Sequence, residues 1–166
     1  MQKLLIVAAV ALMGVIADKS SFPDFDAFHA DCAMDATYPK SCVSIQASMQ
    51  TILTAYKNGD PGNGIYEIVE SSDLDYIWTN RTTPVAKYVD DILFEFTVTG
   101  ENECVVKSKS RSQTMSVYDY STNFCNMWNP LMYSDVFTAL NVYHCKYPAD
   151  EPETVCQKYW AHQNLT

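Results

Sequence analysis

The stretch of residues 88–111 constrains the fold most, because apolar and polar side chains alternate along it. Every second residue over 92–98 is apolar, and this period of two predicts a β-strand with one buried face. A polar turn over 100–103 follows. Residues 104–111 alternate again, so the two runs together predict an antiparallel hairpin.

The segments before this hairpin extend it into an α+β architecture. Residues 65–70 and 74–82 predict two more strands joined by a short turn, which makes an antiparallel β-meander of about four strands. Ser41 is a favourable helix N-cap, and apolar residues at helical spacing predict an amphipathic helix over 42–56. The apolar sheet face must be covered, and this helix is the expected cover.

The flanking segments give weaker patterns. Residues 18–40 are polar and irregular, and we expect them to wrap the domain. Asp119 or Ser121 can cap a short helix that Pro130 ends, because the residue before proline disfavours helical geometry. Residues 131–145 fit either a helix or an extended segment, and the tail from residue 147 is acidic.

The N-terminus has the features of a secretory signal peptide. A basic start is followed by an uncharged, mainly apolar run over 4–17, which is shorter than the roughly 20 residues of a membrane span. We expect cleavage after Ala17, with a short N-terminal anchor as the alternative. Residues 18–166 should then form a single secreted or secretory-lumen domain with no stable membrane span.

The six cysteines predict up to three disulfides in an oxidising compartment. Proximity along the chain favours three pairs, although many pairings are possible: Cys32–Cys42, Cys104–Cys125 and Cys145–Cys156. No Cys-x-x-Cys motif is present, so the sequence predicts no metal site. Two glycosylation sequons begin at Asn80 and Asn164.

The charge balance argues against a nucleic-acid partner. Twenty acidic residues face eleven basic ones, for a net charge of −9. The one basic cluster, over 107–111, has too few charges for a nucleic-acid footprint and is interpreted as a solvated sheet face.

Polar residues of the central stretch form the candidate site. Asp90 and Asp91 are adjacent on a strand, so they point to opposite faces and one of them should point inward. A buried carboxylate requires a cation or several donors. We predict that seven side chains converge at one end of the sheet: Arg81, Asp90, Asp91, Ser110, Arg111, Asp119 and Asn123. They form either a buried network that fixes strand register or a polar pocket.

No motif predicts catalysis or a cofactor. The sequence contains no nucleophile elbow, phosphate loop, zinc-protease helix or calcium loop. His29, His144 and His162 are far apart in the sequence and are interpreted as surface residues.

Several segments resemble the domain of unknown function 1499 family. They include Tyr88-Val89-Asp90-Asp91, Lys107-Ser108-Lys109-Ser110-Arg111 and Asp119-Tyr120-Ser121-Thr122-Asn123, and the resemblance covers roughly residues 65–128. Lys107 replaces the family's first arginine, and Phe124-Cys125 replace its basic residues after the asparagine. The cysteine-rich version is similar to uncharacterised secreted proteins of protists and algae. The resemblance implies a fold and no known activity.

Three functions are therefore open. The first is a non-enzymatic secreted binding or interaction module, whose partner is a protein or a small molecule held at the end of the sheet. The second is a hydrolase-like enzyme that uses Asp90 or Asp91 with Arg111 and Asp119. The third is a structural extracellular component. An open pocket favours the first two, and a sealed network favours the third.

Overall fold

The computed structural model describes residues 18–163, with the backbone alone for 158–163; the expected signal peptide and Asn164 lie outside this range. Six strands form one antiparallel sheet in the order β2-β3-β4-β5-β1-β6. The elements are η1 (Lys19–Ser21), β1 (Asp31–Tyr38), α1 (Cys42–Ala55), η2 (Tyr56–Asn58), β2 (Ile65–Ser72), β3 (Tyr76–Thr82), β4 (Val89–Gly100), β5 (Glu103–Ser112), α2 (Thr122–Ser134), β6 (Ala139–Tyr143) and α3 (Pro152–Gln163). The expected α+β class is confirmed.

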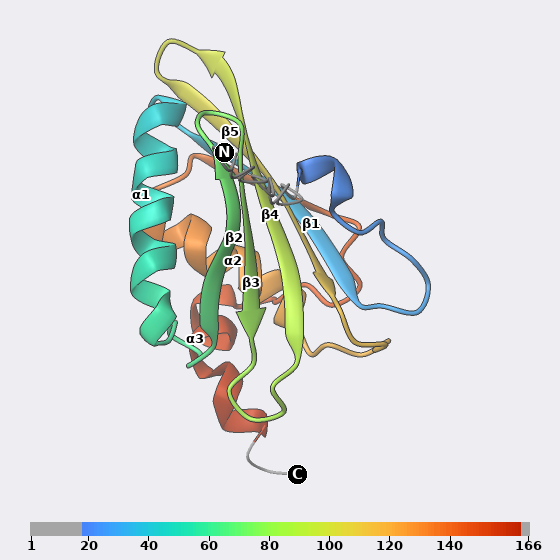
Figure 1. Cartoon of the computed structure of the whole chain (residues 1–166). Coiled ribbons are helices and arrows are strands. Elements are labelled where there is room, and N and C mark those ends of the chain that lie inside the picture. Colours follow the sequence, from blue (N-terminus) through green and yellow to red (C-terminus); the bar gives the residue numbers. More distant parts are fainter. Residues whose placement is uncertain (1–17, 164–166) are drawn as a thin grey trace, which may run out of the picture.

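The sheet has two unlike faces. Figure 1 shows the three α-helices gathered on one side of the sheet, here called the helix face, and η1 on the other, here called the outer face. Ile92, Phe94 and Phe96 of β4 pack in the main core on the helix face. Leu93 and Trp78 join a smaller apolar cluster on the outer face. The alternation along the central strands therefore separates two packing layers, as expected for a sheet covered mainly on one side.

The predicted meander and helix are both confirmed. Strands β2 to β5 pair consecutively and antiparallel. Helix α1 begins after Ser41, whose side chain accepts a hydrogen bond from the backbone N–H of Ser44. Ile45, Met49 and Leu53 recur every four residues and are fully buried, so α1 covers the helix face at the β2 side of the sheet.

The expectation that residues 18–40 are irregular is wrong for β1. This strand lies between β5 and β6. Its alternate residues Cys32, Met34, Ala36 and Tyr38 are fully buried, which is the period of two that a half-buried strand requires. The pattern is weak in the sequence because two of the four buried positions, Cys32 and Ala36, have small side chains, and the intervening Ala33 is also apolar.

The expectation that Pro130 ends α2 is also wrong, because Pro130 lies inside the helix. A proline has no N–H, so it leaves the carbonyl four residues earlier without its helical hydrogen bond. That carbonyl belongs to Asn126, and the Tyr66 hydroxyl donates to it at 2.9 Å. Beyond α2, residues 139–143 form the edge strand β6, which settles the ambiguity of 131–145, and α3 follows in the acidic tail.

All six cysteines are paired, as expected, but none in the pairing that proximity favours. The disulfides are Cys32–Cys145, Cys42–Cys104 and Cys125–Cys156. Cys32 lies near the start of β1 and Cys42 follows its end, and six residues of strand span roughly 20 Å. Bridged Cα atoms lie within about 7 Å, so Cys32 is out of reach of Cys42. Three disulfides indicate folding in an oxidising environment.

Candidate functional site

The seven predicted residues reach the same end of the sheet but lie on its two faces. Directly paired residues of antiparallel strands share a face. Arg81, Asp90 and Ser112 pair in one row on the helix face. Asp91, Arg111 and Asp31 pair in the next row, on the outer face. The sequence analysis placed Arg111 beside Asp90. In the structure the two side chains lie on opposite faces of the sheet.

The helix-face residues form a sealed network. Asp90 is 1% exposed, and Ser112 Oγ and Asn126 Nδ2 donate to its carboxylate at 2.7 and 2.8 Å. Ser110 Oγ donates to the side-chain oxygen of Asn123 at 2.7 Å. Burial raises the pKa of Asp90, and the hydrogen bonds from Ser112 and Asn126 oppose this rise.

Asp119 closes this network at the start of α2. Its Oδ2 accepts from both the backbone N–H and the side-chain amide of Asn123, at 3.0 Å each. Burial raises the pKa of Asp119, although these hydrogen bonds lower it in part. Since Asp90, Ser110, Ser112, Asp119 and Asn123 are all buried, the network supports the structural interpretation.

Arg81 is held by a partner that the sequence did not suggest. Its guanidinium donates to both oxygens of Asp60, at 2.8 and 3.2 Å, and both side chains are almost fully buried. Asp60 Oδ1 also accepts from the backbone N–H groups of Gly62 and Gly64. A Cβ on Gly64 would lie 2.2 Å from the guanidinium, so only glycine lets this loop close over Arg81.

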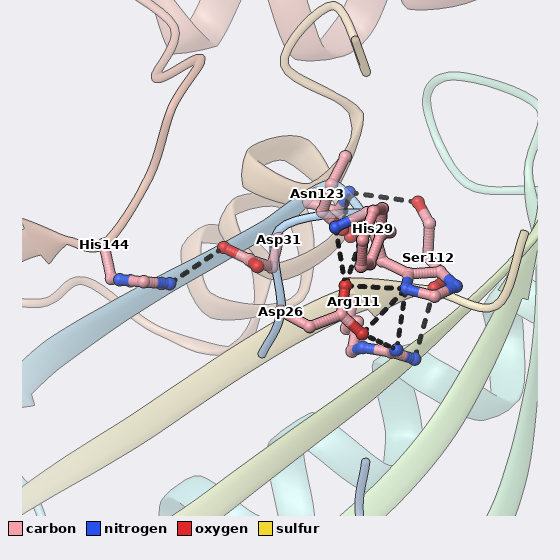
Figure 2. Close-up of polar contacts among 9 residues, drawn as sticks. Asp26, His29, Asp31, Arg111, Ser112, Asn123 and His144 are labelled. Carbon is pink, nitrogen blue, oxygen red and sulfur yellow. Dashed lines mark hydrogen bonds and ion pairs between the residues drawn. The ribbon is translucent and has the colours of Figure 1, made fainter. Parts of the chain in front are cut away.

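The outer face carries a charged cluster that the sequence did not reveal. Arg111 Nη2 donates to Asp26 Oδ2 at 2.7 Å (Figure 2). His29 Nδ1 lies 2.8 and 2.9 Å from the two oxygens of the same carboxylate. The same Nδ1 lies 2.9 Å from Arg111 Nη2, so Asp26, His29 and Arg111 form one close cluster. The hydrogen bonds from Arg111 and His29 hold the pKa of Asp26 well below its usual range.

A second carboxylate–imidazole pair lies beside the first. His144 Nε2 is 3.2 Å from Asp31 Oδ1, and Figure 2 shows this pair next to the Asp26 cluster. The His144 ring stacks on Phe25, with ring centroids 4.9 Å apart. Burial raises the pKa of Asp31, and the charge of His144 acts against this rise. The backbone φ of His144 is 45°, a strained conformation for a non-glycine residue that often occurs at functional sites.

These two pairs line one cavity of about 400 Å³. Its lining residues come from the N-terminal segment, β1 and the turns before α2 and after β6: Asp26, Ala27, His29, Ala30, Asp31, Val117, His144, Cys145 and Lys146. The Cys32–Cys145 disulfide joins β1 to the turn after β6 and so fixes one wall. We call this the charged cavity. It is within the size range of small-molecule sites.

Sequence reasoning missed the charged cavity because it treated the histidines as isolated. The Asp26-x-x-His29 spacing and the His144-Cys145 neighbours are local signals, but either alone is weak. Among the residues that the structure describes, no group of three or more His, Cys, Asp or Glu side chains could hold a metal ion. Asn80 of the first sequon lies in β3, half-buried.

Within the described range, no helix has the length and apolar character needed to cross a bilayer.

The comparisons with known proteins show a fold likeness. No family model and no curated protein matches the chain. The structure of CalU16 from Micromonospora echinospora aligns with a TM-score of 0.50 and 8% identity, over 82% of this chain and 89% of that one. At this identity the likeness concerns the fold alone.

Two further solved structures align less well. A conserved protein from Geobacillus kaustophilus has a TM-score of 0.40 and 8% identity, over 52% of this chain and 76% of that one. Norcoclaurine synthase from Thalictrum flavum has a TM-score of 0.32 and 12% identity, over 79% of this chain and 89% of that one.

Proposed function

We propose that this chain is a secreted, disulfide-bonded binding protein whose charged cavity holds a small zwitterionic ligand. The observation that carries the proposal is the convergence of Asp26, His29, Asp31, His144 and Lys146 on one preformed cavity. A concave site with a few convergent polar groups is the usual form of a small-molecule site. Secretion is supported by the three disulfides and by the signal-peptide pattern of residues 1–17.

The charges of the cavity suggest the class of ligand. Arg111 is already neutralised by Asp26. Within the described residues, the only ion pair of Asp31 is with His144. The side chain of His144 is 59% exposed. Lys146 has no ion pair among these residues, and its ammonium lies 5.6 Å from the ring centroids of Tyr118 and Tyr147. A carboxylate and an ammonium are therefore open to a ligand that carries both charges.

Binding fits the cavity better than catalysis does. None of its nine lining residues carries a hydroxyl, and its one cysteine is in a disulfide. Catalysis by a hydroxyl or thiol nucleophile requires such a group beside a base. The hydrolase-like alternative relied on Asp90 or Asp91 with Arg111 and Asp119. Asp90 and Asp119 lie in the sealed network, and Arg111 is paired with Asp26.

Family membership belongs to the same proposal. We infer from the motif residues alone that residues 65–128 are a divergent member of the domain of unknown function 1499 family. Glycosylation at Asn80 and Asn164 is likewise proposed from the sequons.

The test is isothermal titration of the secreted full chain with a panel of amino acids, dipeptides and amino sugars, each beside an analogue that lacks one charge. We expect one zwitterion to bind and both of its single-charge analogues to bind at least about tenfold more weakly, since charged hydrogen bonds contribute about 1.5–3 kcal/mol.

Three variants complete this test. Asp31→Asn and Lys146→Gln should each weaken binding by a similar factor. Lys40→Gln is the control, because Lys40 follows the opposite end of β1 and pairs with Asp135. No binding across the panel, or equal weakening by Lys40→Gln, would reject the proposal.

A further inference from the structure

A second cavity lies between α2, the segment around the start of β6 and the start of α3. Its volume is about 530 Å³. It is lined by α2, the segment leading into β6 and the start of α3: Trp128, Met132, Val136, Phe137, Leu140, Glu151, Pro152, Glu153 and Thr154. We call it the apolar groove. None of its residues contributes to the charged cavity.

The floor of the groove is part of the protein's apolar interior. Trp128 is 3% exposed and belongs to the main core, and Phe137 and Leu140 pack against that core. Met132 and Val136 are more open, at 36% and 73% exposed. An apolar chain that entered the groove would remove both of these side chains from water, which is favourable in proportion to the area covered.

A disulfide fixes the two helices that line the groove relative to each other. The Cys125–Cys156 disulfide links α2 to α3, so the two helices that form opposite walls cannot separate freely. A preformed groove avoids the entropy cost that a ligand would otherwise meet in ordering its site.

The rim of the groove is acidic. Glu151 and Glu153 stand at the start of α3, and both are exposed. Neither carboxylate has an ion pair within the described part of the chain. Acidic residues in a first helical turn stabilise the helix, but that role leaves their outward charge available. The net charge of −9 further favours the approach of a cation.

We infer that the apolar groove binds a cationic amphiphile. The alkyl chain lies on Trp128, Phe137 and Leu140, and the ammonium group lies between Glu151 and Glu153. A groove of this volume accepts a small molecule rather than a folded domain. The inference concerns a separate site and does not depend on the ligand of the charged cavity.

The experiment compares two detergents of equal chain length and opposite charge on the full secreted chain. Decyltrimethylammonium and decanesulfonate are titrated calorimetrically below their micelle concentrations. We expect one decyltrimethylammonium per chain, bound roughly three- to tenfold more tightly than the sulfonate, as two exposed ion pairs allow. Glu151→Gln/Glu153→Gln should abolish this preference.

A matched pair of surface variants locates the site. Val136→Lys places a cation at the groove mouth and should abolish binding of the ammonium. Val98→Lys is the control, because Val98 is similarly exposed, at 65%, but lies at the far end of β4. Asp31→Asn, which impairs the charged cavity, should leave binding in the groove unchanged.

Three outcomes would overturn the inference. They are equal affinity for the two detergents in the wild type, equal loss of binding in Val98→Lys and Val136→Lys, and binding of several detergents per chain. A dimer in sedimentation velocity that Val136→Lys dissociates would instead assign the groove to a second copy of this chain.

Discussion

Replacing Asp90 tests whether the helix-face network is structural. Its two carboxylate oxygens accept from Ser112 Oγ and Asn126 Nδ2, at 2.7 and 2.8 Å. Asp90→Ala removes both acceptors from a site that is 1% exposed. Each buried donor left without a partner costs about 1–3 kcal/mol, and the Ser112 hydroxyl can rotate in part. We therefore expect Asp90→Ala to lower the free energy of unfolding by roughly 3 kcal/mol.

Asp90→Asn is a milder change whose effect depends on pH. The amide keeps the shape and one acceptor, so the cost should be about 1 kcal/mol near neutral pH. Burial raises the pKa of Asp90. Above the unfolded-state value of about 3.9, the folded chain keeps a proton that the unfolded chain releases, and the contribution of Asp90 to stability falls as pH rises. Asparagine carries no such proton, so the wild type's advantage over Asp90→Asn should be greatest at low pH.

The assay is urea denaturation with the disulfides intact, followed by circular dichroism at about pH 3, 5 and 7. Asp91→Asn is the control, because Asp91 lies on the outer face and its remaining carbonyl can still accept from the Trp78 indole. A loss below about 1 kcal/mol in Asp90→Ala would refute the structural interpretation. An advantage of the wild type over Asp90→Asn that grows with pH would refute the raised pKa.

Two other changes test the framework around the sites. Cys125→Ala/Cys156→Ala opens a loop whose ends are 31 residues apart, and chain entropy predicts a loss of about 3–4 kcal/mol in the free energy of unfolding, measured by urea denaturation. An unchanged midpoint would contradict this. In Gly64→Ala the new Cβ must displace the buried Arg81 guanidinium, so the free energy of unfolding should fall by about 3–5 kcal/mol. Gly100→Ala is the control, because its Cβ would lie 3.4 Å from the nearest atom and should leave stability nearly unchanged. Both variants are compared by thermal denaturation. Equal effects of the two alanines would show that the loop over Arg81 tolerates a side chain.

The parts of the fold that could be predicted depend on contacts between neighbours in the sequence. Helix α1 has its own cap at Ser41 and its own apolar stripe. Strands β2 to β5 follow one another with short turns, so each pairs with the next. Their periodicity and turn residues were sufficient because no distant segment intervenes between them.

The elements that were missed depend on distant partners. Strand β1 pairs with β5 and β6, which both come much later in the chain. The prediction for Pro130 used only its sequence neighbours. In the structure the Tyr66 hydroxyl, from β2, donates to the Asn126 carbonyl, which has no helical hydrogen bond because Pro130 lacks an N–H. The rule that proline ends a helix assumes that this carbonyl has no other donor, and here tertiary structure supplies one.

The error over Arg111 has a different cause, because the alternation of the strands already contained the answer. Asp90 has the parity of Ile92, Phe94 and Phe96, which face the helices, whereas Arg111 has the opposite parity to Val106. Comparing only the ends of the strands placed Arg111 beside Asp90. Comparing their faces would have paired it with Asp91, as the observed register does.

Assigning each strand residue to a face of the sheet would still not have predicted the charged cavity. Asp26 and His29 belong to a loop with no periodicity, and this loop is fixed against the outer face by Arg111 and by the backbone hydrogen bond from Ser116 to Phe28. The alternation of a strand predicts which side chains lie on each face. It does not predict which loop packs against them, because that depends on tertiary contacts. Asp26 comes five residues before Asp31, and Asp31 lies opposite Arg111 in the β1–β5 pairing, so the contact between Asp26 and Arg111 could be inferred only once that long-range pairing is known.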